Sequence, residues 1–181
     1  MKKNIIYLAS HTAKLKRNNV VYNDIKGDVD IISDMLGVNL EPYDILIATP
    51  PCNYYSRANY RRDTSKYSQE TKHLLPDILK KFYKTKKPFI VENVINKVLM
   101  RDIIDNHILN GYFYKEHGRH SYFMSHDIDF SHLHQVSDNV QNKSRNIRQG
   151  GYNVNIVLDY CIDCIEKELE NEKITKKETN R

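Results

Sequence analysis

A hydrophobic run that ends in two prolines and a cysteine decides the fold of this chain: Asp44-Ile45-Leu46-Ile47-Ala48-Thr49-Pro50-Pro51-Cys52. Four consecutive apolar residues indicate a strand that is buried on both faces, as in a parallel sheet. A second run, at residues 89–91, is followed by Glu92-Asn93-Val94. Ligands of open α/β sheets bind outside the carboxyl ends of the strands. We therefore expect the Cys52 thiol and the Glu92 carboxyl group to face one crevice.

Strand and helix patterns alternate along the rest of the chain, which predicts a single α/β domain over residues 1–170. Its sheet should be open and mostly parallel, with flanking helices. The expected strands are residues 4–9, 20–22, 44–49, 89–91, 111–115 and 119–124. The expected helices are residues 70–84, 96–105 and 154–169, with loops at 53–69 and 125–149. Pro76 must kink its helix or lie in its first turn. The charged residues 171–181 are expected to form a flexible tail.

The composition excludes several classes of protein. The chain has 181 residues, of which 40% are hydrophobic and 28% charged, as is typical of soluble globular proteins. No apolar run approaches the ~20 residues of a membrane span, and the apolar run after the basic start is too short for a signal peptide. We therefore expect a cytoplasmic protein. The three cysteines form no disulfide framework, and the net charge of +5 is only a mild bias towards polyanions.

A thiol and a carboxyl group at neighbouring strand ends suit attack on an electron-poor ring. A thiolate adds to the ring, and a carboxylic acid stabilises the charge that develops on a ring nitrogen. This chemistry requires a cysteine with enhanced thiolate character.

The motifs around these two residues resemble those of the DNA cytosine-5 methyltransferases, in particular short, phage-type members. Residues 50–58, Pro50-Pro51-Cys52-Asn53-Tyr54-Tyr55-Ser56-Arg57-Ala58, are similar to the nucleophile motif, and residues 92–94 match the Glu-Asn-Val motif. The resemblance implies a Rossmann-like domain that uses S-adenosylmethionine and acts on double-stranded DNA. It implies that Cys52 adds to carbon 6 of a flipped cytosine, that Glu92 acts as the acid at nitrogen 3, and that Asn93 sets the geometry of the site.

Weaker similarities extend over most of the chain. Gly118-Arg119-His120-Ser121-Tyr122-Phe123 resembles a reduced arginine motif, which implies that Arg119 holds the base or a phosphate. For the cofactor, the resemblance implies contacts from Asp28 of a Gly-Asp element, from Pro50, and from Gly151 and Asn153 of a closing motif. Residues 125–149 would form a minimal recognition insert.

One loop departs from the family pattern. The loop after the first strand, Ala9-Ser10-His11-Thr12-Ala13, contains none of the glycines that the family places there for close approach to the cofactor. The oligomeric state stays open, and a partner chain could complete the cofactor site.

The residues after Cys52 mix cations with aromatic side chains, which predicts a loop that closes over DNA through Ser56, Arg57, Arg61 and Arg62. An ordinary solvated loop is the alternative.

Three other functions remain open at this point. They are a catalytically silent DNA-binding relative, an amino-group DNA methyltransferase, and a structural or interaction protein on the same fold. We expect no metal site, because the spacing of His126, Asp127, Asp129, His132 and His134 fits no known ligand pattern. Cys161 and Cys164 lie on the last predicted helix, and we expect both to face the hydrophobic core rather than to perform redox chemistry.

Overall fold

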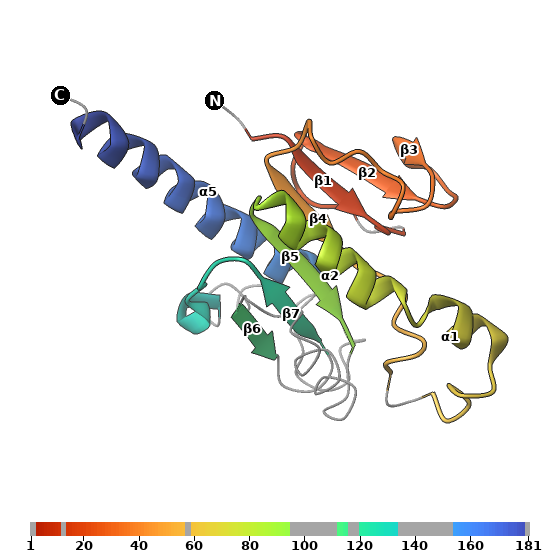
Figure 1. Ribbon diagram of the computed structural model, residues 1–181. Coiled ribbons are helices and arrows are strands. Elements are labelled where there is room, and N and C mark those ends of the chain that lie inside the picture. Colours follow the sequence, from red (N-terminus) through yellow and green to blue (C-terminus); the bar gives the residue numbers. More distant parts are fainter. Residues whose placement is uncertain are drawn as a thin grey trace.

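The computed structural model describes residues 3–11, 14–56, 59–94, 112–115, 120–133 and 154–179, and in these it forms one seven-stranded sheet (Figure 1). The strand order is β3-β2-β1-β4-β5-β7-β6. The strands are β1 (Ile5–Leu8), β2 (Val20–Asp24), β3 (Ile31–Ile32), β4 (Ile45–Ala48), β5 (Phe89–Asn93), β6 (Tyr112–Lys115) and β7 (Ser121–Met124). Strands β1 to β5 pair in parallel, whereas β7 runs antiparallel to both of its neighbours. The predicted open, mostly parallel sheet is confirmed; the short β3 was not predicted.

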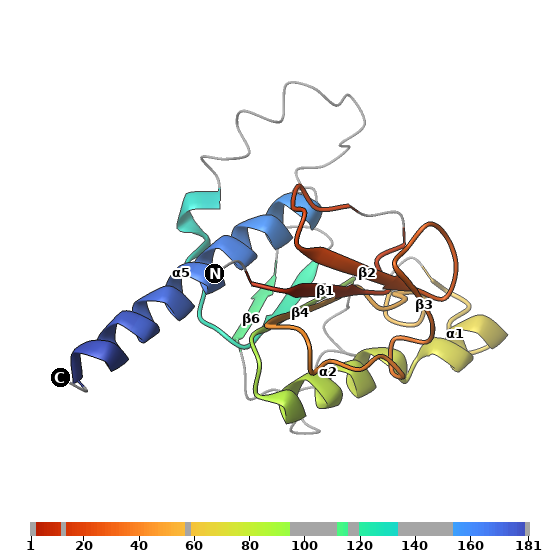
Figure 2. The ribbon, with the colours of Figure 1, turned by 90° about the horizontal axis from the view of Figure 1, so that it is seen from above.

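Helices cover both faces of the sheet, as the view from above shows (Figure 2). The strand residues alternate between the two faces, as the pleat requires. Ile6 and Leu46 belong to the core on the side of α2 (Leu74–Thr85), while Ile5 and Ile45 belong to the core on the side of α5 (Val154–Thr179). Every residue of β1 and β4 is buried, which explains their continuous apolar runs.

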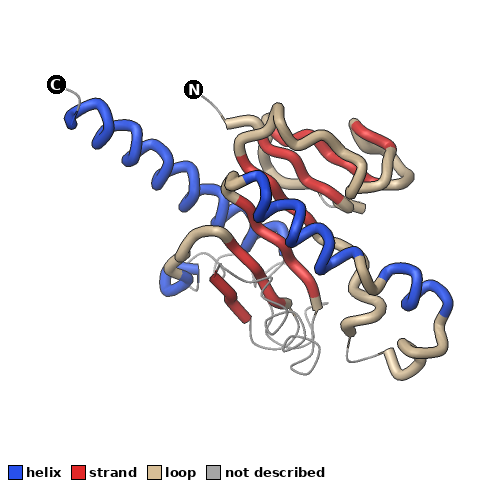
Figure 3. Tube along the Cα trace, viewed as in Figure 1, coloured by secondary structure: helices blue, strands red, loops and turns tan. Residues whose placement is uncertain are grey.

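The helix expected over residues 70–84 is two helices in the structure (Figure 3). The first, α1 (Lys66–Thr71), begins inside the predicted loop, and its N-cap Ser65 accepts a hydrogen bond from the Ser68 amide. Pro76 lies in the first turn of α2, which is one of the two places that its missing amide allows. The apolar stripe of α2 packs on the sheet through Leu75, Ile78, Leu79 and Phe82, all fully buried.

The last helix, α5, is longer than the sequence predicted. It continues to Thr179 and projects beyond the sheet (Figure 1), where we expected a flexible tail from residue 171. Residues 171–175 are exposed, and the segment is rich in glutamate and lysine, which are strong helix formers. Its solvated composition therefore did not exclude a helix. Cys161 is fully buried and Cys164 packs beside it, so their predicted core-facing role is confirmed.

The β1–β2 and β3–β4 connections contain no helix in their described residues, which are 9–11 and 14–19 in the first and 33–44 in the second. One basic side chain attaches each connection to a covering helix. Arg17, between β1 and β2, forms ion pairs with three carboxylates of α5, those of Asp159, Asp163 and Glu166. Lys81 of α2 donates from Nζ to two carbonyl oxygens of the β3–β4 crossover, at 2.7 Å each. These contacts hold the crossovers against the two covering helices.

Some expectations lie outside the described residues, namely the helix at 96–105 and residues 134–149 of the recognition insert. A short 3-10 helix, η1 (Phe130–His132), occupies part of the segment predicted to be irregular. Within the described ranges, no helix is long and apolar enough to cross a membrane.

Candidate active site

The carboxyl ends of β1, β2, β4 and β5 lie at one edge of the sheet, on the side of α1 (Figure 1). The chain builds β2 and β3 on one side of β1 and then crosses to build β4 and β5 on the other. The edge between β1 and β4 is therefore a topological switch point, which is where open α/β sheets bind ligands. The side chains that follow these strands form the candidate site.

Cys52 and Glu92 come together at the tips of β4 and β5. Glu92 is the fourth residue of β5 and is 8% exposed, while Cys52 follows β4 and is partly exposed. Asn93 joins the two tips, because its buried Nδ2 donates to the Pro50 carbonyl oxygen at 2.8 Å. Burial, and then the negative charge of Glu92, raise the pKa of the Cys52 thiol, which is the opposite of the enhanced thiolate character that the sequence analysis required. The thiol and the carboxyl group therefore lie near enough for the charge of one to act on the other.

A tight turn presents Cys52 at this edge. The backbone amides of Tyr55 and Ser56 donate to the Cys52 carbonyl oxygen at 3.0 and 2.8 Å. Tyr55 is buried and its hydroxyl donates to the Lys72 carbonyl oxygen, between α1 and α2. The turn that carries the thiol is therefore anchored to the core on the α2 side.

A buried tyrosine that the sequence analysis did not single out lies beneath this pair. Tyr7 of β1 is 1% exposed and its hydroxyl is hydrogen-bonded to Thr49. Thr49 Oγ1 in turn donates to the Ala9 carbonyl oxygen at 2.8 Å. Burial is the main cause that raises the Tyr7 pKa, and the charge of Glu92 adds to it. Polar contacts thus connect the tip of β1 to that of β4, and the separate Asn93–Pro50 bond connects the tips of β4 and β5.

His120 is a second residue that the sequence reasoning missed. Its Nδ1 lies 2.7 Å from Glu92 Oε1, and the two side chains are 24% and 10% exposed. The register pairs Glu92 with Tyr122 across antiparallel strands, so His120 is at the diagonal position on the same face. Only this register brings the two together, and no signal in the sequence defines it.

On the other side of the switch point, the loops after β1 and β2 line a cavity of about 420 Å³. Its lining residues are His11, Lys14, Asp24, Lys26, Gly27 and Asp28. Asp24 ends β2, and its carboxylate accepts hydrogen bonds from the His11 and Ile25 amides at 2.8 and 2.7 Å. The predicted cofactor residue Asp28 lies on the cavity wall, whereas Pro50 is buried beneath Cys52 and bonded to Asn93.

The loop after β1 has a left-handed backbone at two positions that are not glycine. Ala9 and His11 have φ angles of 51° and 52°. This conformation costs most residues roughly 1–2 kcal/mol and is the one that glycine adopts freely. The glycines that the family pattern expects here are absent from the sequence, yet the backbone takes a conformation that suits glycine.

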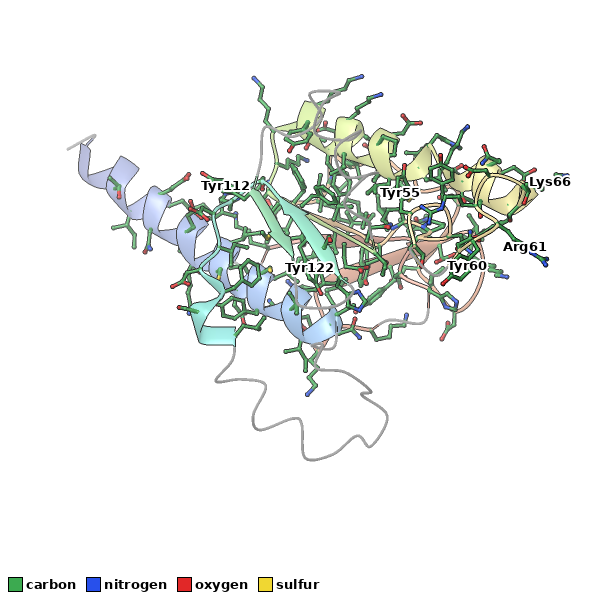
Figure 4. All side chains as sticks on the ribbon, turned by 90° about the horizontal axis from the view of Figure 1, so that it is seen from below. Tyr55, Tyr60, Arg61, Lys66, Tyr112 and Tyr122 are labelled. Carbon is green, nitrogen blue, oxygen red and sulfur yellow. The ribbon has the colours of Figure 1, made fainter. Side chains whose placement is uncertain are left out.

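The proposed DNA loop contains two arginines in different environments. Arg62 is half-buried, and its guanidinium donates to the Ser56 and Asn59 carbonyl oxygens at 3.1 and 3.3 Å. Arg61 is exposed, and it lies with Tyr60 and Lys66 at the α1 end of the molecule (Figure 4). The tyrosine is 95% exposed. The arrangement leaves Arg61 as the more accessible cation.

Four of the predicted site residues, Arg57, Arg119, Gly151 and Asn153, lie outside the described residues. In the part of the chain that is described, no three histidine, cysteine, aspartate or glutamate side chains converge on a common point suited to a metal ion.

Comparison with known families agrees with this geometry. A family described as C-5 cytosine-specific DNA methylase matches residues 8–114, which is more than half of the chain and includes both strand tips. No curated protein matches the sequence. The cytosine-5 methyltransferase resemblance is therefore confirmed at the level of the family, and with it the Rossmann-like α/β fold. The chain belongs to the C-5 cytosine-specific DNA methylase family.

Proposed function

We propose that this protein methylates carbon 5 of cytosine in double-stranded DNA through a covalent adduct at Cys52. The observation that carries the proposal is the pairing of Cys52 with Glu92 at adjacent strand tips, fastened by the hydrogen bond from Asn93 to Pro50. Carbon 5 of cytosine becomes nucleophilic only after a thiolate has added to carbon 6. The pair supplies the two groups that this step needs, a nucleophile and an acid.

The Cys52 thiolate donates an electron pair to carbon 6 and the sulfur–carbon bond forms. The π pair of the C5–C6 bond moves to the C4–C5 bond, and the π pair of the C4–N3 bond moves to nitrogen 3, which takes up the proton of Glu92. Carbon 5 would then be able to take a methyl group from a sulfonium donor, whose methyl–sulfur bond would break to release a neutral thioether. Loss of the carbon-5 proton to a base expels the Cys52 thiolate, and nitrogen 3 returns its proton to Glu92.

The cavity at the tips of β1 and β2 fits S-adenosylmethionine, which would supply an electrophilic methyl group. A volume of about 420 Å³ lies in the usual range for cofactor sites. In related folds an acidic residue after the second strand binds ribose hydroxyls, and Asp24 ends β2 here. A side chain built at Gly27 would meet no protein atom within 4 Å. Asp24 would hold the ribose, and Asp28 would lie near the adenine.

We assign DNA contacts to the loop after Cys52. Arg61 would contact phosphate, while Arg62 would shape the loop through its bonds to carbonyl oxygens. Ser56, whose amide bonds to Cys52, would lie next to the target base.

The decisive experiment traps the adduct. We expect duplex DNA that contains 5-fluorocytosine in varied sequence contexts, incubated with the protein and S-adenosylmethionine, to give a denaturation-resistant complex. Cys52→Ala should abolish this complex, and the matched variant Cys164→Ala should retain it. Methylation that survives in Cys52→Ser would instead identify an amino-group methyltransferase.

One observation favours a second candidate, a catalytically silent DNA-binding relative. The loop after β1 places His11, where the family has glycine, on the wall of the cavity. Such a relative would bind duplex DNA in a filter assay but would show no S-adenosylmethionine binding in equilibrium dialysis.

A further inference from the structure

The histidine beside the candidate acid has no role in the function proposed above. His120 precedes β7, and its Nδ1 lies 2.7 Å from Glu92 Oε1. Glu92 pairs with Tyr122 in the antiparallel register, so His120 extends over the carboxyl group from the next residue on the same face.

The two side chains differ in their access to solvent. The His120 side chain is 24% exposed and the Glu92 side chain 10% exposed. A proton that leaves Glu92 during the reaction has to be replaced, and the imidazole is the more accessible member of the pair. Imidazole exchanges protons at physiological pH, whereas an ordinary carboxyl group is deprotonated there.

We propose that His120 is a positioning residue that orients Glu92 and exchanges its proton with solvent. The inference deepens the cytosine chemistry proposed above and depends on it for its catalytic meaning. When the pair shares one acidic proton, either the imidazolium Nδ1–H donates to the Oε1 carboxylate oxygen, or the Glu92 O–H donates to Nδ1 of the neutral imidazole. After Glu92 has protonated nitrogen 3, the imidazolium can return a proton to the carboxylate through the same hydrogen bond.

Two other titratable side chains of the described residues interact with Glu92. Cys52, on the turn after β4, and Tyr7, of β1, each have a pKa that its negative charge raises. Both are neutral in their protonated forms, so neither compensates the carboxylate. Among the described residues, His120 is the partner of Glu92 that can become a cation.

The first test needs no enzymatic activity. We would follow the His120 ring by NMR from pH 5 to 9 in the unmodified protein and in Glu92→Gln. A carboxylate favours the imidazolium form, so the midpoint of the His120 titration should fall by about one pH unit in Glu92→Gln. Equal midpoints in the two proteins would overturn the coupling of His120 to Glu92.

The second test separates a proton-exchange role from a structural one. His120→Asn keeps a hydrogen-bond donor near the Nδ1 position but does not titrate. We expect its rate of adduct formation on 5-fluorocytosine DNA to fall below that of the unmodified protein by a factor that grows about tenfold between pH 5.5 and 7.5. A deficit that stays constant with pH would overturn the proposal. His126→Asn is the matched control. His126 Nδ1 lies 2.6 Å from the neutral Ser125 hydroxyl, so its replacement should leave the pH dependence of adduct formation unchanged.

The two failures can be distinguished. If the unmodified protein forms no adduct on any duplex, the proposed cytosine chemistry fails, and with it the catalytic meaning of His120. If the adduct forms, and its rate of formation has the same pH dependence in His120→Asn as in the unmodified protein, only the role of His120 fails.

Discussion

Asn93 donates a buried hydrogen bond of 2.8 Å from Nδ2 to the carbonyl oxygen of Pro50. This single contact joins the residue after Glu92 to the residue two before Cys52. It fixes the tips of β5 and β4 relative to each other, although 43 positions separate them in the sequence. The parallel pairing of β4 with β5 brings the candidate nucleophile and acid to one edge of the sheet, and the Asn93 bond extends the connection beyond the last paired residues, Ala48 and Val91.

Loss of the hydrogen bond between Asn93 and Pro50 should lower the stability of the protein. Asn93→Ala leaves the buried Pro50 carbonyl without its donor, and we expect the free energy of unfolding to fall by about 1–3 kcal/mol. Urea denaturation measures the change. Asn171→Ala, at an exposed position of α5, is the control and should change stability by less than about 0.5 kcal/mol. Equal losses in both variants would contradict the assigned role.

The reactivity of Cys52 should increase when Glu92 loses its charge. Burial and the Glu92 carboxylate both raise the thiol pKa, so the neutral thiol is favoured and alkylation should accelerate as pH rises. Glu92→Gln removes the opposing charge, lowers that pKa, and should speed alkylation by iodoacetamide at pH 8 several-fold. The measurement is made in a Cys164→Ser background, with Glu172→Gln, on the exposed part of α5, as the charge control. Slower alkylation in Glu92→Gln would show that the two groups do not interact as described.

Glycine should be favourable at the left-handed positions of the loop after β1. His11→Gly relieves a backbone conformation at φ 52°, and we expect a gain in stability of about 1 kcal/mol. Ser10→Gly is the matched control. Ser10 lies between the two left-handed residues, is 1% exposed and donates to the Asn23 carbonyl, so its replacement should destabilise the protein. Thermal or urea denaturation distinguishes the two; a loss in both would argue against relief of backbone strain.

The attachment of the β1–β2 crossover to α5 should depend on Arg17. Its guanidinium contacts Asp159, Asp163 and Glu166 and its side chain is 15% exposed. Arg17→Met leaves three carboxylates on one face of α5 without their counter-ion, and we expect a loss of about 1–3 kcal/mol that shrinks as salt screens the repulsion. Lys16→Met, at the exposed neighbouring position, should change little. An equal effect of the two substitutions would contradict the stabilising role of the Arg17 ion pairs.

The two arginines of the loop after Cys52 should respond differently to substitution. Arg61→Ala should weaken duplex DNA binding by a few-fold and reduce the salt slope by about one, without a change in stability. Arg62→Ala should also destabilise the protein, because it removes donors from the Ser56 and Asn59 carbonyl oxygens. Filter binding at several salt concentrations and urea denaturation measure the two effects. Unchanged DNA binding in Arg61→Ala would remove the proposed phosphate contact.

Several predictions from the sequence depended on local pattern, and these agree with the structure. The run at residues 45–48 is a strand buried on both faces, and the stripe that includes Ile78 and Phe82 is the buried face of α2. Strands β6 and β7 also lie where the sequence predicted them. The error at residues 171–179 has a local cause as well. A charged composition is compatible with both a tail and a solvated helix, so it could not distinguish them.

The sequence by itself determined the fold class and singled out Cys52 and Glu92 as candidates, because burial of β4 and β5 imposes a continuous apolar run and each of the two residues lies shortly after such a run. Only the tertiary structure decided what surrounds the pair. His120 reaches Glu92 through an antiparallel register, Tyr7 contacts Thr49 across neighbouring strands, and Asp24 joins the cavity through a turn. Hydrogen bonds between residues far apart in the chain leave no periodic pattern in the sequence, so these partners could be identified only from the folded structure.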